Sequence, residues 1–206
     1  LKDRCFSSEP EIVITLAEKY IEGCLQGGVI PVLKHFPGHG VTLNDSHTDS
    51  CVSNLTLENL LKEDLLPFIK IFGKTNIPIM TSHIKFPKID NEIVTYSNKW
   101  LKQISEKVFP QEKPFFISDD IEMEAALSGK TQSQRVITAL KAGCKMVIAT
   151  TNLKKDIVTS KSSHQYYKNN YLTDELIDYS KEFCNDLYIK DELVKNELNE
   201  EHYNEA

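Results

Sequence analysis

The residues of this chain best suited to chemistry gather in one segment, 34–47, which reads KHFPGHGVTLNDSH. It holds three histidines, a lysine and an aspartate. Pro37 and Gly38 keep the segment from being helical, because proline lacks the N–H that a helix interior needs and glycine is costly there. Titratable side chains on a loop that follows an apolar run are well placed to meet a ligand, since the preceding element holds the loop rigidly. The segment therefore predicts a ligand site.

Metal binding is one chemistry open to this loop. Imidazole and carboxylate groups are zinc ligands, and the loop offers them at His35, His39, His47 and Asp45. A helical His-x-x-x-His pair would put two imidazoles on one face, but the proline and glycine between His35 and His39 forbid that geometry. Loop histidines need a specific fold to converge on an ion, so a metal-dependent hydrolase is the weaker alternative.

Proton transfer is the second chemistry, and Asp45 and His47 are the pair that suits it. Two residues apart on an extended loop, their side chains can point to the same side. The carboxylate can then accept the imidazole N–H, fix its tautomer and raise its basicity. An isolated Asp-x-His sequence is usually a surface turn. Beside the 34–40 run, we favour an acid–base pair.

Short apolar runs alternate with helical patterns along the chain. The apolar runs, each followed by polar residues, are 29–33, 77–80, 115–117 and 145–149. Helical spacing of apolar residues marks 8–23, 56–73, 97–108 and 132–142. This alternation is typical of βα units around a parallel sheet that is buried on both faces. Ligands of such folds bind at the carboxyl ends of the strands, where the 34–47 loop, Ser82–His83 and Asp119–Asp120 all fall.

Asp119 and Asp120 follow the third apolar run. A carboxylate at a strand end is a candidate nucleophile or base, although an aspartate there can also cap a helix. We expect Asp119, nearest the strand, to face the site, and Asp120 either to take a structural role or to support the residues of the site. Lys34 is either a surface charge or a hydrogen-bond donor to a polar ligand. Arg4 has no local context that lifts it above a surface charge.

Composition argues against some classes of function. The 206 residues carry a formal net charge of −6, whereas non-specific nucleic-acid binding rests on a positive field. No apolar run approaches the roughly 20 residues that span a bilayer, so we expect no membrane partner. The five cysteines are scattered and form no CxxC, which favours reduced thiols in a cytoplasmic protein. The first residue is Leu1, which fits a fragment or a processed product.

Five segments, taken together, resemble glycoside hydrolase family 3, in particular its β-N-acetylglucosaminidases, the cytoplasmic enzymes of bacterial cell-wall recycling. The 34–47 loop resembles the family signature, with KHFPGHG at its start and DSH at its end. The other segments occur in the family's order and read DRCFSS (3–8), MTSH (80–83), ISDDIEME (117–124) and AGCKM (142–146). The likeness covers about residues 1–152.

The resemblance implies a retaining glycosidase that removes terminal, non-reducing β-N-acetylglucosamine and uses no cofactor or metal. It makes Asp119 the nucleophile that forms a glycosyl-enzyme intermediate. It makes His47 the acid/base, a role that most glycosidases give to a carboxylic acid, and Asp45 the residue that orients His47. The residues implied to bind the sugar are Arg4, Lys34 and His35. The implied substrate is the disaccharide of a muropeptide that carries a 1,6-anhydro sugar.

The implied fold is a (β/α)8 barrel of the TIM type, which typically takes about 250 residues. Four strands precede residue 152. We therefore expect residues 1–172 to be the C-terminal part of such a barrel, with about four βα units, and residues 173–206 to be a charged helical tail. The family places further βα units before Arg4, so a missing N-terminal barrel segment is an expected partner.

Two positions depart from the family pattern. Lys145 stands where the family has aspartate, and Ala125 where it has glycine, but neither is implied in the chemistry. Half a barrel also leaves sheet edges unpaired. A second hypothesis is therefore a truncated, non-catalytic remnant of the barrel, and a third is the metal-dependent hydrolase built on the loop histidines.

Overall fold

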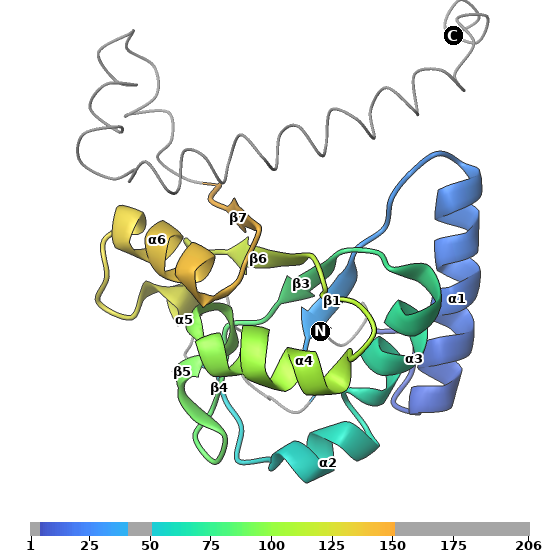
Figure 1. Ribbon diagram of the computed structural model, residues 1–206, viewed down its shortest axis with the longest axis horizontal. Coiled ribbons are helices and arrows are strands. Elements are labelled where there is room, and N and C mark those ends of the chain that lie inside the picture. Colours follow the sequence, from blue (N-terminus) through green and yellow to red (C-terminus); the bar gives the residue numbers. More distant parts are fainter. Residues whose placement is uncertain (1–4, 41–50, 151–206) are drawn as a thin grey trace, which may run out of the picture. The chain divides into compact units, whose positions relative to one another are not determined.

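The computed structural model describes residues 5–40 and 51–150 and contains a main sheet of four parallel strands (Figure 1). The strands, in order across the sheet, are β1 (Leu33–Phe36), β3 (Ile79–Thr81), β6 (Phe116–Asp120) and β7 (Met146–Ile148). This order is also their order along the chain, as in a (β/α) barrel, whereas a doubly wound sheet reverses its order at a switch point. The predicted α/β fold of barrel type is therefore confirmed, with its four strands in the predicted order.

Helices connect the strands and cover the sheet. They are α1 (Pro10–Gln26), α2 (Leu57–Lys62), α3 (Leu66–Thr75), the 3-10 helix η2 (Val94–Tyr96), the π-helix η3 (Lys99–Ile104), α4 (Ser105–Val108), α5 (Glu124–Leu127) and α6 (Gln132–Ala142). Helix α1 packs beside α3, and α6 lies beside β7 (Figure 1). Within the described ranges, no helix combines the length and the apolar character needed to cross a membrane.

The predicted helix 56–73 is wrong in one respect, because the structure divides it into α2 and α3. Helix α2 begins with a capping box in which Thr56 Oγ1 accepts the N–H of Asn59. Pro67 causes the break, since it has no N–H to donate to the carbonyl of residue 63 and its ring would clash with that carbonyl. The break leaves Asp64 between the two helices, where it faces Gly38 of the segment that follows β1.

The first strand begins later than predicted, at Leu33 rather than at residue 29. Val29 belongs to the end of α1, because its N–H donates to the carbonyl of Cys24 at 2.8 Å, the long hydrogen bond of a Schellman motif. Pro31 then has no N–H for a sheet ladder. The strand therefore contains Lys34 and the first histidine of the motif, which the sequence had placed on the loop.

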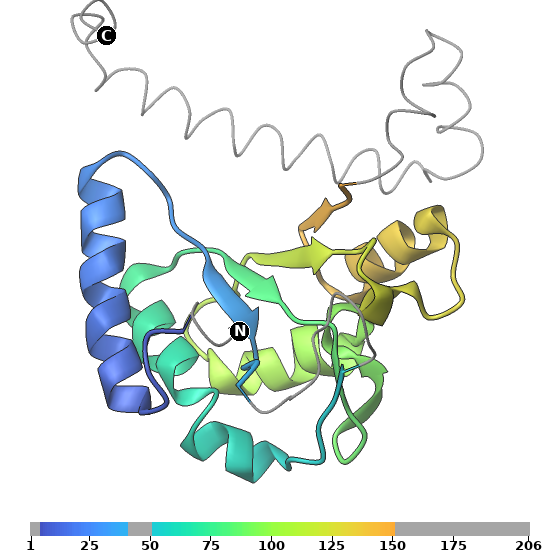
Figure 2. The same ribbon diagram turned by 180° about the vertical axis from the view of Figure 1, so that it is seen from behind.

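A second, smaller sheet was not predicted. It consists of β2 (Cys51–Val52), β4 (Ile84–Phe86) and β5 (Asp90–Ile93), with β2 parallel and β5 antiparallel to β4. Strands β4 and β5 form a hairpin between β3 and η2, seen from behind in Figure 2. The strands are two to four residues long, and β5 reads DNEI, so neither length nor apolar alternation marks them in the sequence.

The core of the sheet is an aromatic cluster around Phe36, the last residue of β1. Phe36 is fully buried. Its ring centroid lies 5.3 to 6.1 Å from four others, those of Phe68, Trp100, Phe109 and Phe116. The rings of Phe68 and Trp100 meet it edge to face, an arrangement that stabilises aromatic pairs beyond the area they bury. The cluster joins β1, β6, α3 and η3.

Replacing Phe36 by alanine is expected to lower the free energy of unfolding by about 3–5 kcal/mol, because the change leaves a cavity among the rings. Phe6→Ala is the matched control, since Phe6 is 50% exposed, and we expect it to change that free energy by less than about 1 kcal/mol. Urea denaturation followed by circular dichroism measures both values. Equal losses in the two variants would mean that the cluster is not the centre of the core.

Candidate active site

Strands β1 and β6 bring His35 and Asp119 to the same edge of the sheet, although β3 lies between the two strands. His35 Nε2 lies 3.5 Å from Asp119 Oδ2, and the two side chains are 11% and 20% exposed. Both groups are therefore largely shielded yet open on one side. This confirms that the two polar strand ends meet, as the sequence predicts. A carboxylate beside an imidazole in a partly exposed site is an arrangement used in nucleophilic and acid–base catalysis.

The two adjacent aspartates differ in what they bind. Asp119 Oδ1 accepts the N–H of Asp120 at 2.8 Å, and its other oxygen is the one near His35. Asp120 Oδ1 accepts the N–H groups of Glu122 at 3.0 Å and Thr150 at 3.3 Å, and Oδ2 accepts the Thr150 hydroxyl. Asp120 thus ties the end of β6 to the chain that follows β7. It has the structural role expected for it, and Asp119 turns towards the imidazole.

The segment after β1 is held close to the helix break. The N–H of Gly38 donates to the carbonyl of His35 at 2.8 Å, and Gly38 has a φ of +139°. A Cβ at this position would lie 2.4 Å from Asp64 Cβ, which is near the root of that side chain rather than at its flexible end. Only glycine fits here, so close packing against Asp64 explains why the motif has glycine at position 38.

Asp64 and His39 complete the surroundings of this segment. Burial raises the pKa of the Asp64 carboxyl above its usual range, and the neighbouring charge of Glu63 acts in the same direction. The ring of His39 lies 5.7 Å from that of His35, with 68° between their planes. A half-buried carboxyl and two imidazoles therefore surround the turn that follows β1. The sequence did not single out Asp64, because its position depends on the break at Pro67.

Of the other predicted site residues, the structure describes Lys34 but not Arg4, Asp45 or His47. Lys34 lies on β1 with an exposed side chain. Arg4, Asp45 and His47 lie outside the described residues, as does the tail predicted over 173–206. Among residues 5–40 and 51–150, no group of three or more histidine, cysteine, aspartate or glutamate side chains is arranged to hold a metal ion.

His83 is more deeply involved than its sequence indicated. It follows β3, its side chain is almost fully buried at 1% exposure, and both ring nitrogens have partners. Nδ1 lies 2.9 Å from Thr95 Oγ1, and Nε2 lies 2.9 Å from the backbone oxygen of Asp120. Burial lowers the pKa of His83, and His39 also lowers it, against the opposing effects of the Asp120 carbonyl and the Asp119 and Asp120 charges. The only indication of this in the sequence is that His83 belongs to the polar MTSH segment at the end of an apolar run.

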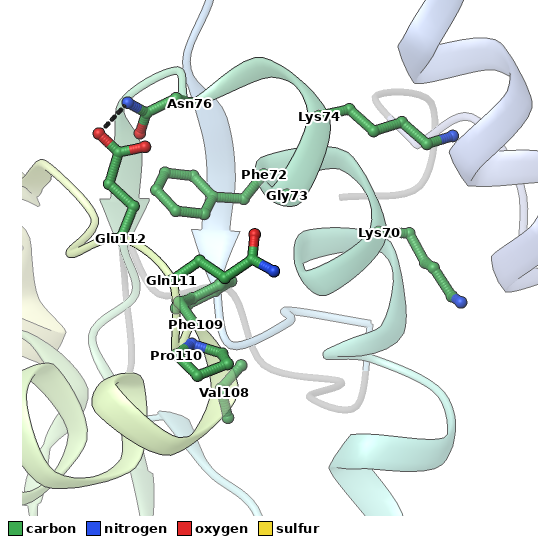
Figure 3. A pocket seen from close by; sticks show the side chains of 10 residues that line it. All are labelled: Lys70, Phe72, Gly73, Lys74, Asn76, Val108, Phe109, Pro110, Gln111 and Glu112. Atoms are coloured by element: carbon green, nitrogen blue, oxygen red, sulfur yellow. Dashed lines mark hydrogen bonds between the residues drawn. The ribbon is translucent and has the colours of Figure 1, made fainter.

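A separate pocket lies at the opposite ends of the strands (Figure 3). Its volume is about 490 Å³, and it lies between the residues that precede β3 and those that precede β6. Asn76 Nδ2 donates to Glu112 Oε1 on one side, and the side chains of Lys70 and Lys74 extend away from that pair (Figure 3). Catalytic sites of barrel enzymes lie at the carboxyl ends of the strands. This pocket is therefore not the candidate active site.

Comparisons with known proteins point to one family. A sequence profile described as "Glycosyl hydrolase family 3 N terminal domain" matches residues 1–183. The chain is 38% identical over 146 residues to a protein of Xanthomonas oryzae pv. oryzae named "Beta-hexosaminidase", and the alignment covers 71% of this chain and 43% of that protein.

Solved structures agree with the sequence comparison. CbsA from Thermotoga neapolitana is 31% identical with a TM-score of 0.75, over 96% of this chain and 44% of that one. The β-N-acetylglucosaminidase from Thermotoga maritima is 29% identical with a TM-score of 0.68, over 84% of this chain and 38% of that one. The chain thus spans less than half the length of each of these proteins.

Replacing Gly38 by alanine is expected to destabilise the fold more than the same change at Gly129. Both glycines have positive φ, +139° and +67°, but a Cβ at Gly129 would meet no atom within 4 Å. Gly129→Ala should cost about 1–2 kcal/mol for the backbone conformation alone. Gly38→Ala should cost at least about 2 kcal/mol more, because it also overpacks against Asp64. Urea denaturation of the two variants measures the difference, and equal costs would contradict the close approach of Gly38 and Asp64.

Proposed function

This chain belongs to glycosyl hydrolase family 3, and from that premise we propose that it carries the catalytic edge of a β-N-acetylhexosaminidase. The proposed reaction is retaining hydrolysis of a terminal, non-reducing β-N-acetylglucosamine. The observation that carries the proposal is the pair of His35 and Asp119, 3.5 Å apart at the carboxyl ends of β1 and β6. The name of the Xanthomonas relative, "Beta-hexosaminidase", supports the substrate class.

Asp119 is the proposed nucleophile. Its carboxylate attacks the anomeric carbon of the sugar, the bond to the leaving oxygen breaks, and a glycosyl-enzyme intermediate forms, which water then hydrolyses. Asp120 is the less suitable neighbour, because its two carboxylate oxygens already accept hydrogen bonds from Glu122 and Thr150. In Asp119, by contrast, Oδ1 accepts the N–H of the adjacent residue, Asp120, and Oδ2 faces His35.

His47 is the proposed acid/base, and Asp45 is proposed to orient it. A histidine that is neutral near pH 7 can first donate a proton to the leaving oxygen and later accept one from water. It also avoids a second anion beside Asp119, which a carboxylate in the same role would introduce. The residues proposed to bind the sugar are Arg4, Lys34 and His35. Support for the roles of Arg4, Asp45 and His47 comes from the family resemblance of their segments.

The substrate, the pathway and the cellular location are also part of the proposal. We assign the sugar to a muropeptide disaccharide with a 1,6-anhydro end and the reaction to peptidoglycan recycling in the cytoplasm. The resemblance of the 34–47 loop to the β-N-acetylglucosaminidase signature supports this assignment. The net charge of −6 supports a saccharide rather than a nucleic acid as the partner.

A missing barrel segment is the second proposed partner. Helix α1 exposes an apolar face, with Ile12 49%, Leu16 44% and Tyr20 61% exposed at spacings of four residues. Strand β1, which follows α1, is at the edge of the main sheet among the described strands. In a closed barrel the edge would be paired and each helix would lie between two others. We propose that preceding βα units of a longer polypeptide pair with β1 and cover this face.

The alternative is a non-catalytic remnant of the barrel. It is favoured by one observation, that the chain spans only 43% of the Xanthomonas relative. Under this alternative the strand ends keep their geometry, but the site has no closed barrel to exclude water and hold the sugar. Activity measurements separate it from the leading proposal.

Asp119→Ala is expected to lower the rate of nitrophenyl β-N-acetylglucosaminide hydrolysis by at least about a thousandfold, because it removes the nucleophile. Circular dichroism should show that the variant keeps its fold, since the Asp119 side chain is 20% exposed and does not belong to the hydrophobic core. A chelator should leave the wild-type rate unchanged, whereas a metal-dependent hydrolase would lose activity. An Asp119→Ala variant with the wild-type rate would remove Asp119 from the mechanism.

Hydrolysis by the 206-residue chain is expected to be far slower than hydrolysis by a polypeptide that also includes the upstream βα units. The reason is that an open edge at β1 leaves the inner face of the sheet wet. The same assay, run on both polypeptides at equal concentration, measures the ratio. Equal rates would contradict the missing-segment proposal, and no activity in either polypeptide would favour the non-catalytic remnant.

A further inference from the structure

Three segments that are far apart in the sequence meet at the imidazole of His83. His83 itself follows β3, Thr95 belongs to η2, and Asp120 ends β6. The imidazole is 1% exposed and bridges the other two residues, with both nitrogen contacts at 2.9 Å. A polar ring buried to this degree needs its partners, because an unpaired buried donor or acceptor is costly. The partner of Nε2 is the backbone of the residue next to the proposed nucleophile.

The partners fix which nitrogen carries the proton. The Asp120 backbone oxygen can only accept, so Nε2 must donate to it. The hydroxyl of Thr95 has one proton and lies near two acceptors, the Ser82 backbone oxygen at 3.0 Å and, in a neutral ring, His83 Nδ1 at 2.9 Å. With a neutral ring this proton goes to Nδ1. The hydroxyl of Thr81, 2.8 Å from Thr95 Oγ1, can donate to Thr95 in turn. The carbonyl of Ser82 is served by the backbone N–H of Thr95 at 3.3 Å. A neutral His83 with its proton on Nε2 therefore leaves neither ring nitrogen nor the Ser82 carbonyl without a partner.

The hydrogen bond from His83 replaces one that the main sheet lacks. Strands β3 and β6 pair at Ile79–Phe116 and Met80–Ile117. The pairing of β3 with β1 reaches further, to Phe36–Thr81, and the N–H of Ser82 donates to the carbonyl of Phe36 at 2.9 Å. Asp120 lies three residues past the last pair of β6 with β3, although β6 still pairs there with β7. The imidazole reaches it there and holds the strand end where the backbone of β3 no longer does.

From Asp120 the constraint passes directly to Asp119. The N–H of Asp120 donates to Asp119 Oδ1 at 2.8 Å, while its carbonyl accepts from His83. Asp120 is thus fixed on both sides of its Cα. Among the described residues, the charged and titratable groups that act on His83 are Asp119, Asp120 and His39. Burial lowers the pKa of His83 and so favours the neutral ring. In that form His83 can hold the strand end without placing a positive charge beside the carboxylate of Asp119.

We propose that His83 is a positioning residue for Asp119, acting through the backbone of Asp120. The inference rests on the proposed function of Asp119 as nucleophile and deepens it. An apolar residue of similar size would fill the same space but would leave the Asp120 carbonyl unpaired. The end of β6 would then be held only on its β7 side, by Ile148 and Thr150, and could shift away from β3. A shift of about 1 Å in a reacting group can cost about a hundredfold in rate. Substrate binding, which uses other groups, should change little.

The test compares His83→Leu and His83→Gln in whichever polypeptide hydrolyses the nitrophenyl substrate. His83→Leu removes the donor, and we expect kcat to fall by about a hundredfold with KM changed by less than about threefold. His83→Gln keeps an N–H within reach of the Asp120 carbonyl, and we expect it to recover most of kcat, to within about tenfold of wild type. Tyr96→Phe is the matched control, because Tyr96 is also buried in this region and donates to a backbone oxygen, that of Ala126, at 2.9 Å.

The outcomes separate the inference from the proposed function. A wild-type protein without activity would overturn the proposed function, and the inference with it. An active wild type with an equally active His83→Leu variant would overturn the inference alone. So would a fall of kcat in Tyr96→Phe that matches the fall in His83→Leu, because loss of any buried hydrogen bond would then explain both.

A second measurement needs no activity. The ¹⁵N spectrum of the His83 ring should show the neutral tautomer with the proton on Nε2 at pH 7. A proton on Nδ1 alone would leave Nε2 with nothing to donate to the Asp120 carbonyl and would overturn the inference. Loss of the folded state in both His83 variants, with Tyr96→Phe folded, would make His83 a purely structural residue and would also overturn it.

Discussion

Burial of Phe36 among four aromatic rings is the interaction on which the candidate site depends. Phe36 is the last residue of β1, directly after His35, and its ring is fully buried between α3, η3 and β6. Its carbonyl accepts the N–H of Ser82 at 2.9 Å, which joins the end of β1 to the end of β3. With Phe36 fixed in this way, His35 has little freedom to leave the edge at which Asp119 lies. The core and the chemistry are therefore coupled through one residue.

Side chains take over from the backbone ladder at this edge of the sheet. His83 donates to the carbonyl of Asp120, Ser118 Oγ accepts the N–H of Ile148 at 2.9 Å, and Asp120 binds Thr150. A regular ladder would run straight past the strand ends and leave no room for a ligand. Side-chain hydrogen bonds let the strands separate while each end stays fixed. This explains why buried polar residues, rather than apolar ones, gather below the candidate site.

The sequence predicted the order of the strands and the meeting of the histidine segment with Asp119, because both follow from local patterns and from the geometry of parallel sheets. It misplaced the start of β1, since the N–H of Val29 donates to the end of α1 and Pro31 has no N–H for a sheet ladder. It joined α2 and α3, because the helical spacing of apolar residues continues across Pro67. The roles of His83 and Asp64 depend on tertiary contacts, which a local sequence pattern cannot predict.

Trapping of the glycosyl-enzyme intermediate tests the central claim most directly, that Asp119 at the end of β6 is the nucleophile of a retaining glycosidase. A hydrolysing polypeptide would be incubated with a slow-reacting fluorinated β-N-acetylglucosaminide, digested, and examined by mass spectrometry. Our account predicts one sugar attached to the carboxylate of Asp119, with a product that keeps its β configuration. An adduct on Asp120, or turnover with inversion and no covalent intermediate, would contradict it.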